Sequence, residues 1–160
     1  MTAGMVIRPA VPSDVAALGR LGALLVSVHH AFDPQRFIPV TPSTEGGYAA
    51  FLAAEIERPD ALVLVAEAGG RVVGYAYAAL EGSDFMALRG PAGILYDLLV
   101  DPAHRGEGIG RTLLAAALEA LADRGAPRIL ISAAEGNMAA QRLFAAAGFR
   151  RTMIEMTRES

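Results

Sequence analysis

One stretch of the sequence decides the fold, and it reads Leu98-Leu99-Val100-Asp101-Pro102-Ala103-His104-Arg105-Gly106-Glu107-Gly108-Ile109-Gly110-Arg111-Thr112-Leu113. Its apolar start predicts a buried strand, Pro102 turns the chain, and three alternate glycines precede an apolar helical pattern. Glycine adopts positive φ easily and lets backbone N–H groups come close to a ligand. Because a helix start also carries the positive end of the helix dipole, the stretch predicts an anion site, to which Arg105 and Arg111 add charge.

The spacing of the arginine and the glycines separates three kinds of phosphate-binding loop. A Walker loop needs a lysine, and the sequence has none. The dinucleotide fingerprint Gly-x-Gly-x-x-Gly fails because Arg111 stands where the third glycine should be. Arg105, Gly108 and Gly110 do match Arg/Gln-x-x-Gly-x-Gly/Ala, and here the sequence resembles the GCN5-related N-acetyltransferase (GNAT) superfamily. The resemblance implies a loop that holds the pyrophosphate of acetyl-coenzyme A (acetyl-CoA). The alternative is a glycine-rich turn that only starts a helix.

A second motif follows one helix and one strand later, which is the spacing that the family shows. Asn137 is followed by Ala140, and then by Leu143-Phe144 and Gly148-Phe149. The resemblance extends over about residues 6–156 and is strong over residues 95–149. Asn137 also suits a helix cap, and the two roles are compatible. Phe144 departs from the family, since many members have a tyrosine there that protonates the departing thiolate, and phenylalanine has no hydroxyl.

Carried over position by position, the resemblance implies a set of residues around acetyl-CoA. The end of the strand would offer its backbone to the pantetheine arm, and an N–H near Leu99 or Val100 would meet the thioester oxygen. Other hydroxyls that could replace the one missing at Phe144 belong to Tyr75, Tyr77 and Tyr96; otherwise the thiolate leaves unassisted. The implied cofactor-binding residues are Leu99, Val100, Arg105, Gly106, Gly108, Ile109, Gly110, Arg111, Asn137 and Phe144.

Asp97 is the leading catalytic candidate on the acceptor side. It interrupts the apolar run Ile94–Val100, and an acid in a buried strand requires an explanation. We expect its carboxylate to take the proton of the attacking amine or to anchor the ammonium. A hydrogen bond to nearby backbone or to an arginine is the structural alternative. Tyr96, the second catalytic candidate, either presents its hydroxyl to the substrate or lies in the core. A bulge near Leu98 would change the face that Asp97 occupies, so strand alternation does not decide it.

The histidines carry weaker signals. His29 and His30 end the first predicted helix, where histidine suits the dipole. With Asp33 and Phe37 they could also border an acceptor cleft. His104 adjoins the glycine loop and is expected to be solvated. No spacing of histidines and acids resembles a ligand set, so no metal site is expected.

The rest of the pattern predicts an α/β fold with a mixed central sheet and helices on both faces. Gly69-Gly70 joins two apolar runs and is a strong hairpin signal, so those strands should be antiparallel. The strands at 94–100 and 128–132 are connected through a helix and should be parallel. The resemblance further implies a mostly antiparallel sheet with a splayed parallel strand pair, the acyl-CoA N-acyltransferase fold. The expected strands are residues 6–8, 61–68, 71–80, 94–100, 128–132 and 149–157, and the expected helices are residues 15–30, 44–57, 108–124 and 137–147.

Length and composition narrow the class of protein. With 160 residues, 53% of them hydrophobic, the chain is expected to form one domain over residues 1–160. The absence of cysteine excludes disulfides, thiolate zinc sites and a cysteine nucleophile. A net charge of −3 argues against nucleic-acid binding. No secretory signal is visible and the uninterrupted apolar runs, such as Ala61–Ala66, are short, so we expect a cytoplasmic protein with no membrane partner.

The resemblance therefore implies an acetyl-CoA-dependent N-acetyltransferase. It would transfer an acetyl group to the primary amine of a small molecule by direct attack in a ternary complex. Two alternatives stay open at this point. The missing tyrosine at Phe144 keeps alive a non-catalytic acyl-CoA-binding sensor, and the acceptor could be a protein lysine or N-terminal amine. A homodimer is also left open.

Overall fold

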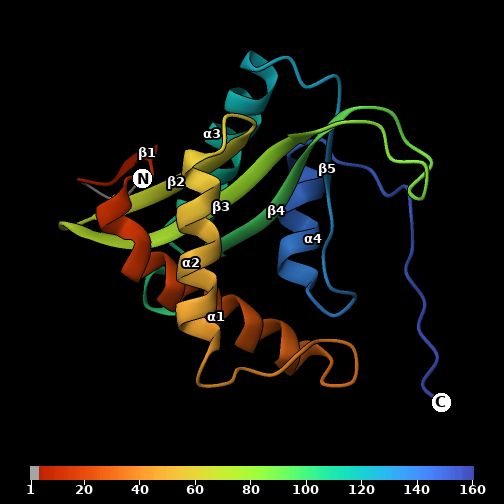
Figure 1. The fold of residues 1–160 in the computed structure, drawn as a ribbon, viewed down its shortest axis with the longest axis horizontal. Helices are drawn as coiled ribbons and strands as arrows, with labels where there is room; N and C mark the ends of the chain where they lie inside the picture. The colour runs from red at the N-terminus through yellow and green to blue at the C-terminus, as the bar shows by residue number, and fades with distance from the viewer. Residues whose placement is uncertain (1–3) are drawn as a thin grey trace.

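The computed structural model describes residues 4–160 and is built on one five-stranded sheet (Figure 1). The strands lie side by side in chain order, β1-β2-β3-β4-β5. The first four are antiparallel to their neighbours, and β5 is parallel to β4. The mixed, mostly antiparallel sheet expected from the sequence is therefore confirmed. The strands are β1 Val6–Pro9, β2 Ala61–Ala68, β3 Arg71–Glu81, β4 Ala92–Val100 and β5 Ile129–Ile131.

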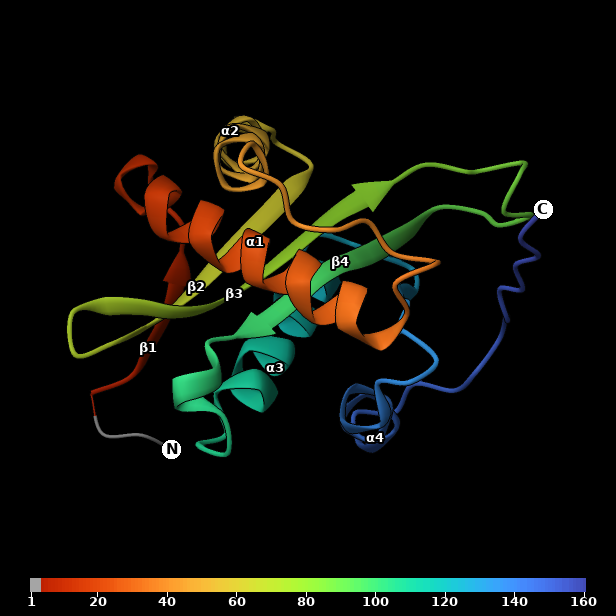
Figure 2. The ribbon, with the colours of Figure 1, turned by 90° about the horizontal axis from the view of Figure 1, so that it is seen from below.

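Helices cover both faces of the sheet, as predicted. Helices α1 and α2 lie on one side, and α3 and α4 lie on the other (Figure 2). Each face has its own core: Leu18, Leu21 and Leu52 pack under α1 and α2, whereas Leu113 and Leu121 belong to the core under α3. The bounds are α1 Val15–Phe32, α2 Thr44–Glu57, α3 Ile109–Asp123 and α4 Met138–Ala146.

The parallel strands β4 and β5 diverge after a short paired section. They pair at only three positions, between residues 93–95 and 129–131. Beyond Leu95, strand β4 continues to Val100 without β5 beside it. The splayed pair implied by the family resemblance is thus present, and the second half of β4 has an open edge.

Strand β4 contains a bulge at Tyr96. Opposite β3, Asp97 faces Tyr77 while Leu95 faces Ala78, so Tyr96 is an extra residue. The bulge that the sequence left open near Leu98 is therefore present, two residues earlier, at Tyr96. Because one extra residue shifts the alternation of the strand, two consecutive side chains turn to the same side.

The bulge places both catalytic candidates on the face covered by α1 and α2. On either side of it, Leu95 and Leu98 pack in the core under α3. Tyr96 stacks on Tyr77, with ring centroids 5.2 Å apart, and Tyr77 belongs to the core under α1 and α2. Alternation alone would have separated Tyr96 from its neighbour Asp97.

The predicted last strand, residues 149–157, is not formed, so that prediction was wrong. Within the part of the chain that the structure describes, residues 149–160 pair with no strand and run away from the sheet (Figure 1). A strand needs a partner for its backbone groups. Apart from the Phe149 N–H, which donates to the Phe144 carbonyl, the contacts that anchor this segment to the described residues are made by side chains, such as the ion pair between Glu155 and Arg36. The alternating sequence is compatible with a strand but does not supply its partner.

Two glycines let α1 and α2 approach each other closely. A Cβ atom on Gly22 would lie 2.2 Å from Cδ1 of Tyr48, and one on Gly19 would lie 2.6 Å from the carbonyl oxygen of Glu45. Gly22 therefore leaves the space through which the Tyr48 ring crosses α1 toward the sheet.

By length and composition, Pro12–Phe32 is also the one segment among residues 4–160 that is apolar enough to cross a membrane. This is weak evidence, because a core helix passes the same test. Leu18 and Leu21 of this segment are fully buried against the sheet.

The close approach of Gly22 to the Tyr48 ring predicts that one added methyl group at position 22 destabilises the protein. We expect Gly22→Ala to lower the free energy of unfolding by about 1–3 kcal/mol, because the new methyl group overlaps the Tyr48 ring. Gly47→Ala in α2 is the matched control, since a Cβ there meets nothing within 4 Å. That variant should be unchanged or more stable by about 0.5–1 kcal/mol, the ordinary gain of alanine over glycine in a helix. Urea unfolding measures both, and equal effects would contradict the close approach.

Candidate active site

Asp97 is buried and shares one oxygen with two tyrosines. Its Oδ2 accepts hydrogen bonds from the hydroxyls of Tyr48 on α2, at 2.5 Å, and Tyr75 on β3, at 2.8 Å. No described residue donates to Oδ1. That atom is nevertheless open to solvent, since the described part of the chain has no buried side-chain oxygen without a partner. Asp97 therefore has one oxygen held in place and one available.

The surroundings of Asp97 favour a basic carboxylate. Burial raises the pKa of Asp97 above its ordinary value, although the two tyrosine hydroxyls and the nearby His29 act in the opposite direction. Burial, together with the charge of Asp97, raises the pKa of Tyr48 and of Tyr75. Both phenols therefore remain protonated hydrogen-bond donors at neutral pH.

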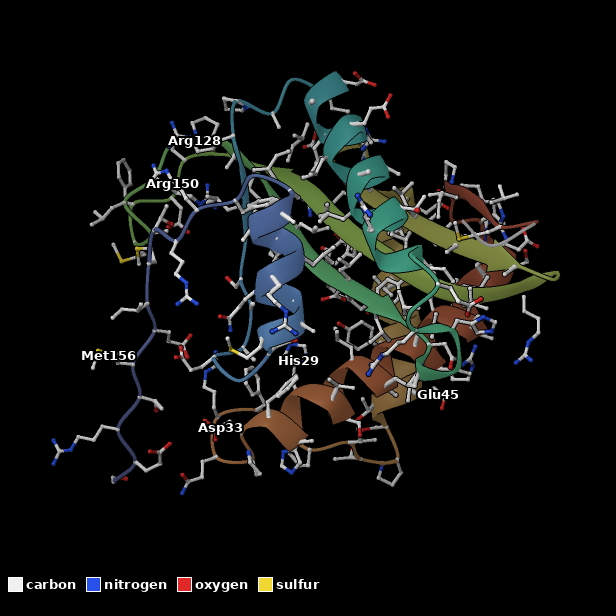
Figure 3. All side chains as sticks on the ribbon, turned by 180° about the vertical axis from the view of Figure 1, so that it is seen from behind. His29, Asp33, Glu45, Arg128, Arg150 and Met156 are labelled. Carbon is white, nitrogen blue, oxygen red and sulfur yellow. The ribbon has the colours of Figure 1, made fainter. Side chains whose placement is uncertain are left out.

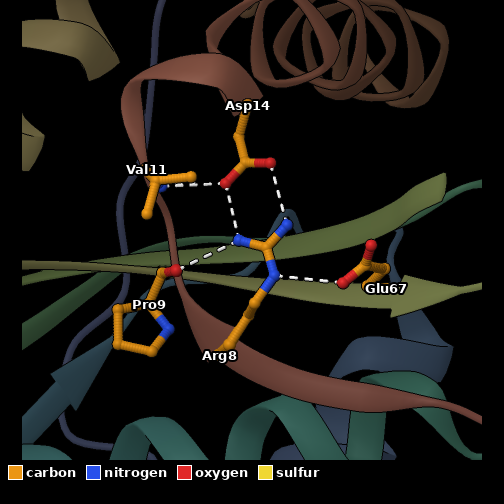
Figure 4. Close-up of polar contacts among 5 residues, drawn as sticks. All are labelled: Arg8, Pro9, Val11, Asp14 and Glu67. Carbon is orange, nitrogen blue, oxygen red and sulfur yellow. Dashed lines mark hydrogen bonds and ion pairs between the residues drawn. The ribbon is translucent and has the colours of Figure 1, made fainter. Parts of the chain in front are cut away.

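The other buried acid of the chain, Asp14, shows what a structural carboxylate looks like here. The Arg8 guanidinium donates to both of its oxygens, at 2.7 and 3.0 Å, and the N–H of Val11 donates at 2.8 Å (Figure 4). Arg8 also donates to Glu67. These bonds hold the pKa of Asp14 below its ordinary value, Arg8 being the main cause. No described residue supplies Asp97 with such a cation. The alternative considered from the sequence, in which an arginine pairs with Asp97, is therefore not what the structure shows.

Asp97 lines a cavity of about 240 Å³ between α1, the loop after α1 and strand β4. The structure thereby brings together Asp97, Tyr96, His29 and Phe37. His30 and Asp33 are not among the lining residues, although Asp33 lies at the same end of α1 as His29 (Figure 3). The lining residues are Leu25, Val26, His29, Phe37, Ile38, Tyr96 and Asp97.

The orientation of His29 is fixed by its own helix. Its Nδ1 lies 2.9 Å from the carbonyl oxygen of Leu25, so Nδ1 carries the proton and Nε2 the lone pair in the neutral ring. The ring also packs edge-on against Phe37, with centroids 5.1 Å apart. Among residues 4–160, no group of three histidines or acids is arranged to hold a metal ion.

The glycine loop has the backbone conformation that its sequence requires. Gly106 and Gly108 have φ of 81° and 80°, in the left-handed region, and Gly108 is the N-terminal cap of α3. Thr112 donates the first bond of the helix, to the Gly108 carbonyl at 3.1 Å. The N–H groups of Ile109, Gly110 and Arg111 therefore have no intrahelical acceptor and face out of the helix start. This is an anion-binding geometry.

The open edge of β4 presents the N–H of Val100. The Asp101 N–H donates to the Val73 carbonyl on β3 at 2.8 Å. Because N–H groups alternate along a strand, Leu99 also faces β3, and Val100 faces the opposite edge, which β5 has left. Of the two residues considered from the sequence, Val100 is the one with a free N–H.

The second motif lies on α4. Asn137 caps this helix, its Oδ1 accepting from the Ala140 N–H at 3.1 Å. Phe144 is buried on the α3 side of the sheet and packs edge-on against Phe149. Between α3 and α4 lies a second cavity of about 490 Å³. It is lined by Arg111, Leu114, Ala115, Leu118, Leu143, Ala146 and Ala147.

The substitute tyrosines lie on the opposite face from Phe144. Tyr75 is engaged with Asp97, and Tyr77 donates to Glu55 at 2.6 Å. Tyr96 donates to Glu81 at 3.1 Å, and its residue is 48% exposed. Of the three, Tyr96 alone lines the acceptor-side cavity.

Comparison with known proteins gives the family. The family model described as "Acetyltransferase (GNAT) family" matches residues 25–149, which include the glycine loop and the second motif. The chain belongs to the GNAT family. This confirms the resemblance inferred from Arg105, Gly108 and Gly110, and it places the chain in an enzyme family of acetyltransferases.

Curated relatives of the GNAT chain include mycothiol acetyltransferases. The one from Kineococcus radiotolerans is 31% identical over 98% of this chain and 46% of its own length. The one from Thermobispora bispora is 38% identical over 58% of this chain and 31% of its own length. The chain thus spans about a third to a half of these relatives. An uncharacterized N-acetyltransferase of Bacillus subtilis, YhfO, is 30% identical over 91% of this chain and 89% of its own length.

Solved structures share the fold along the whole chain. A mutant of the BH1408 protein from Bacillus halodurans has a TM-score of 0.82 at 21% identity, covering 97% of this chain and 99% of that one. The aminoglycoside N-acetyltransferase AAC(6')-Iy, solved in complex with CoA, has a TM-score of 0.76 at 17% identity, covering 100% and 97%.

Sequence reasoning missed two parts of the site. Tyr48, which donates a hydrogen bond to Asp97, comes from a helix that was predicted but carried no functional signal. Gly22, which makes room for the Tyr48 ring, has no distinguishing pattern in the sequence. A contact between residues that are far apart in the chain leaves no local pattern in the sequence around either residue.

The contrast between Asp97 and Asp14 predicts opposite pH dependences of stability. The folded state raises the pKa of Asp97, so ionisation of Asp97 reduces stability as the pH rises through and above the ordinary carboxyl range near ~3.9. The Asp97→Asn variant should therefore gain stability relative to the parent protein between pH 4 and pH 8.

Asp14→Asn is the control with the reverse sign. The pKa of Asp14 is lowered by folding, so its ionised form stabilises the protein above the ordinary pKa, and this contribution disappears as the pH falls. We expect Asp14→Asn to lose about 1–3 kcal/mol at pH 7 and less in acid. Urea unfolding of the three proteins across this range measures both slopes. Parallel curves for the two variants would contradict the assignment of the two carboxylates.

Proposed function

We propose that this protein transfers the acetyl group of acetyl-CoA to the primary amine of a small molecule, by direct attack within a ternary complex. The observation that carries the proposal is the arrangement around the second half of β4. Asp97, which has one oxygen without a partner among the described residues, lines a cavity on one side. Val100, three residues further along β4, directs its N–H to the edge that no described strand occupies, and the glycine loop follows after one short turn.

The donor side is assigned to backbone groups and two arginines. The N–H groups of the loop Gly106–Arg111 would bind the pyrophosphate, with the side chains of Arg105 and Arg111 adding charge. The edge of β4 at Leu99 and Val100 would take the pantetheine arm, because no strand occupies that edge beyond Leu95. Asn137 and Phe144, at the start and on the buried side of α4, would border the same arm.

The acceptor must lose protons for the reaction to proceed. A primary alkylammonium has a pKa of about 10.4, so roughly one molecule in 10³ is neutral at pH 7. Oδ1 of Asp97 would anchor the ammonium and accept a proton from it. The amine nitrogen then forms a bond to the acetyl carbonyl carbon, and the carbon–sulfur bond breaks. Of the two protons that the ammonium loses, one ends on the departing sulfur and the other reaches solvent.

The structure offers groups for the developing charges in this reaction. The Val100 N–H would donate to the carbonyl oxygen as it becomes negative. Phe144 cannot protonate the thiolate. Tyr96 is the tyrosine that lines the cavity, and its hydroxyl would have to leave Glu81 to serve as the donor. A thiol with a pKa near ~8.5 is also a tolerable leaving group without assistance.

Turnover distinguishes this proposal from an acyl-CoA-binding sensor. Thiol release from acetyl-CoA is to be measured across alkylamines, polyamines, amino acids, aminoglycosides and peptides. Turnover of a small amine supports the proposal, and turnover of peptides alone indicates a protein acetyltransferase. Tight binding of acetyl-CoA without turnover of any acceptor indicates a sensor.

The glycine loop yields a binding prediction with a close control. Gly108→Val should abolish acetyl-CoA binding in calorimetry, because a branched side chain would cover the N–H groups at the start of α3. Gly125→Val, at the other end of α3, is the matched control: its φ of 86° gives the same backbone strain, and a Cβ there also meets open space. We expect Gly125→Val to be destabilised to a similar extent but to bind acetyl-CoA normally. Equal affinities in the two variants would refute the loop assignment.

Asp97 yields a prediction about the rate. Asp97→Asn should retain acetyl-CoA affinity but turn over about 10²-fold more slowly, because it removes the proton acceptor. Its activity should also recover toward high pH, where more of the amine arrives neutral. Steady-state kinetics from pH 6 to pH 9 measure both effects. A parent-like rate in a folded variant would exclude Asp97 from the chemistry.

A further inference from the structure

The cavity next to Asp97 is lined mainly by apolar side chains. Leu25 and Val26 of α1 form one wall, and Phe37 and Ile38 of the following loop form another. The polar side chains among its lining residues are those of His29, Tyr96 and Asp97. A ligand that places its ammonium on Asp97 would therefore have the rest of its surface against hydrocarbon.

Asp97 is the only acid among the lining residues of this cavity. Glu55 and Glu81, which accept hydrogen bonds from Tyr77 and Tyr96, both form ion pairs with Arg58. Asp33, in the loop after α1, does not line the cavity and accepts hydrogen bonds from two backbone N–H groups of its own loop. The cavity therefore offers one negative charge, enough for one ammonium group.

The loop wall also disfavours a second positive charge. Phe37 and Ile38, the lining residues of this loop, have no side-chain oxygen that could accept a hydrogen bond from a second ammonium. A second ammonium placed against them would lose part of its hydration without gaining an acceptor.

The cavity is also small. Its volume of about 240 Å³ lies below the roughly 300–1,000 Å³ of typical ligand pockets. A compact hydrocarbon or a single aromatic ring suits this space. The hydroxyl groups of an amino sugar would instead be left without partners, and each unpaired group typically reduces affinity by about tenfold or more.

We propose that the acceptor is a primary monoamine carried by a compact apolar group, such as a short alkyl or an arylalkyl chain. Polyamines and amino sugars are excluded by the single carboxylate and the hydrocarbon walls. This inference rests on the proposed acetyl transfer and specifies which amines undergo it. It differs from the aminoglycoside and mycothiol chemistry that the names of related proteins mention.

The test is a homologous series of amines with the full chain and acetyl-CoA. From n-propylamine to n-hexylamine, kcat/KM should rise about fourfold per methylene until the cavity is full, the value expected for burial of one CH₂ group. The matched pair n-hexylamine and 1,6-diaminohexane isolates the second charge, and we expect the diamine to be at least about tenfold poorer. 2-Phenylethylamine should be a good substrate and glucosamine a poor one.

Two variants of the loop connect this selectivity to the cavity. Ile38→Asn replaces a lining residue and should flatten the dependence on chain length. Val40→Asn is the matched control, since Val40 is an exposed residue of the same loop that does not line the cavity. It should keep the parent slope.

The outcomes separate this inference from the proposed function. If glucosamine or the diamine is the better substrate, or if the slope is absent, acetyl transfer stands and the apolar-amine inference is wrong. If no amine releases thiol, the proposed function fails, and calorimetry of n-propylamine and n-hexylamine binding then decides the cavity assignment. Tighter binding of n-hexylamine supports an apolar-amine site, and equal or undetectable binding overturns it.

Discussion

The site depends on a carboxylate that is buried without a cation. Asp97 is held by two phenol hydroxyls, which fix the position of Oδ2 but do not neutralise its charge. Such an arrangement leaves the group more basic than an ion-paired acid, and it leaves Oδ1 without a partner among the described residues. Asp14, which meets the guanidinium of Arg8, shows the opposite solution within the same chain. One buried acid therefore serves the fold, and the other is available for chemistry.

Several features of the fold position this carboxylate and the groups around it. The bulge at Tyr96 turns Asp97 toward α1 and α2, and Gly22 lets the Tyr48 ring pass α1 to reach it. The splay of β5 away from β4 frees the edge at Val100, three residues beyond. A buried carboxylate and a backbone N–H without a partner strand are thereby placed on one strand, close to the glycine loop that begins α3. Their proximity follows from the covalent continuity of residues 97–110.

Membership of the GNAT family establishes the kind of enzyme, and the acceptor cavity carries the individual features of this chain. The loop and α4 motifs match the family pattern, except that Phe144 lacks the usual hydroxyl. The cavity, in contrast, is built from the end of α1 and the loop that follows it, where the sequence carried little information. Its hydrocarbon walls and its single available charge, and not the family motifs, suggest which amine is accepted.

The sequence by itself determined the features that depend on neighbouring residues. The glycine loop, the capping by Asn137, the Gly69-Gly70 hairpin and the parallel crossover all follow from short patterns, because turns, caps and helix starts are local. The tertiary structure decided what depends on distant contacts. It put a bulge at Tyr96, brought Tyr48 to Asp97, and left residues 149–157 unpaired although they alternate like a strand. The physical reason is that a strand needs a partner and a buried charge needs donors, and one-dimensional patterns do not specify which distant segment supplies them.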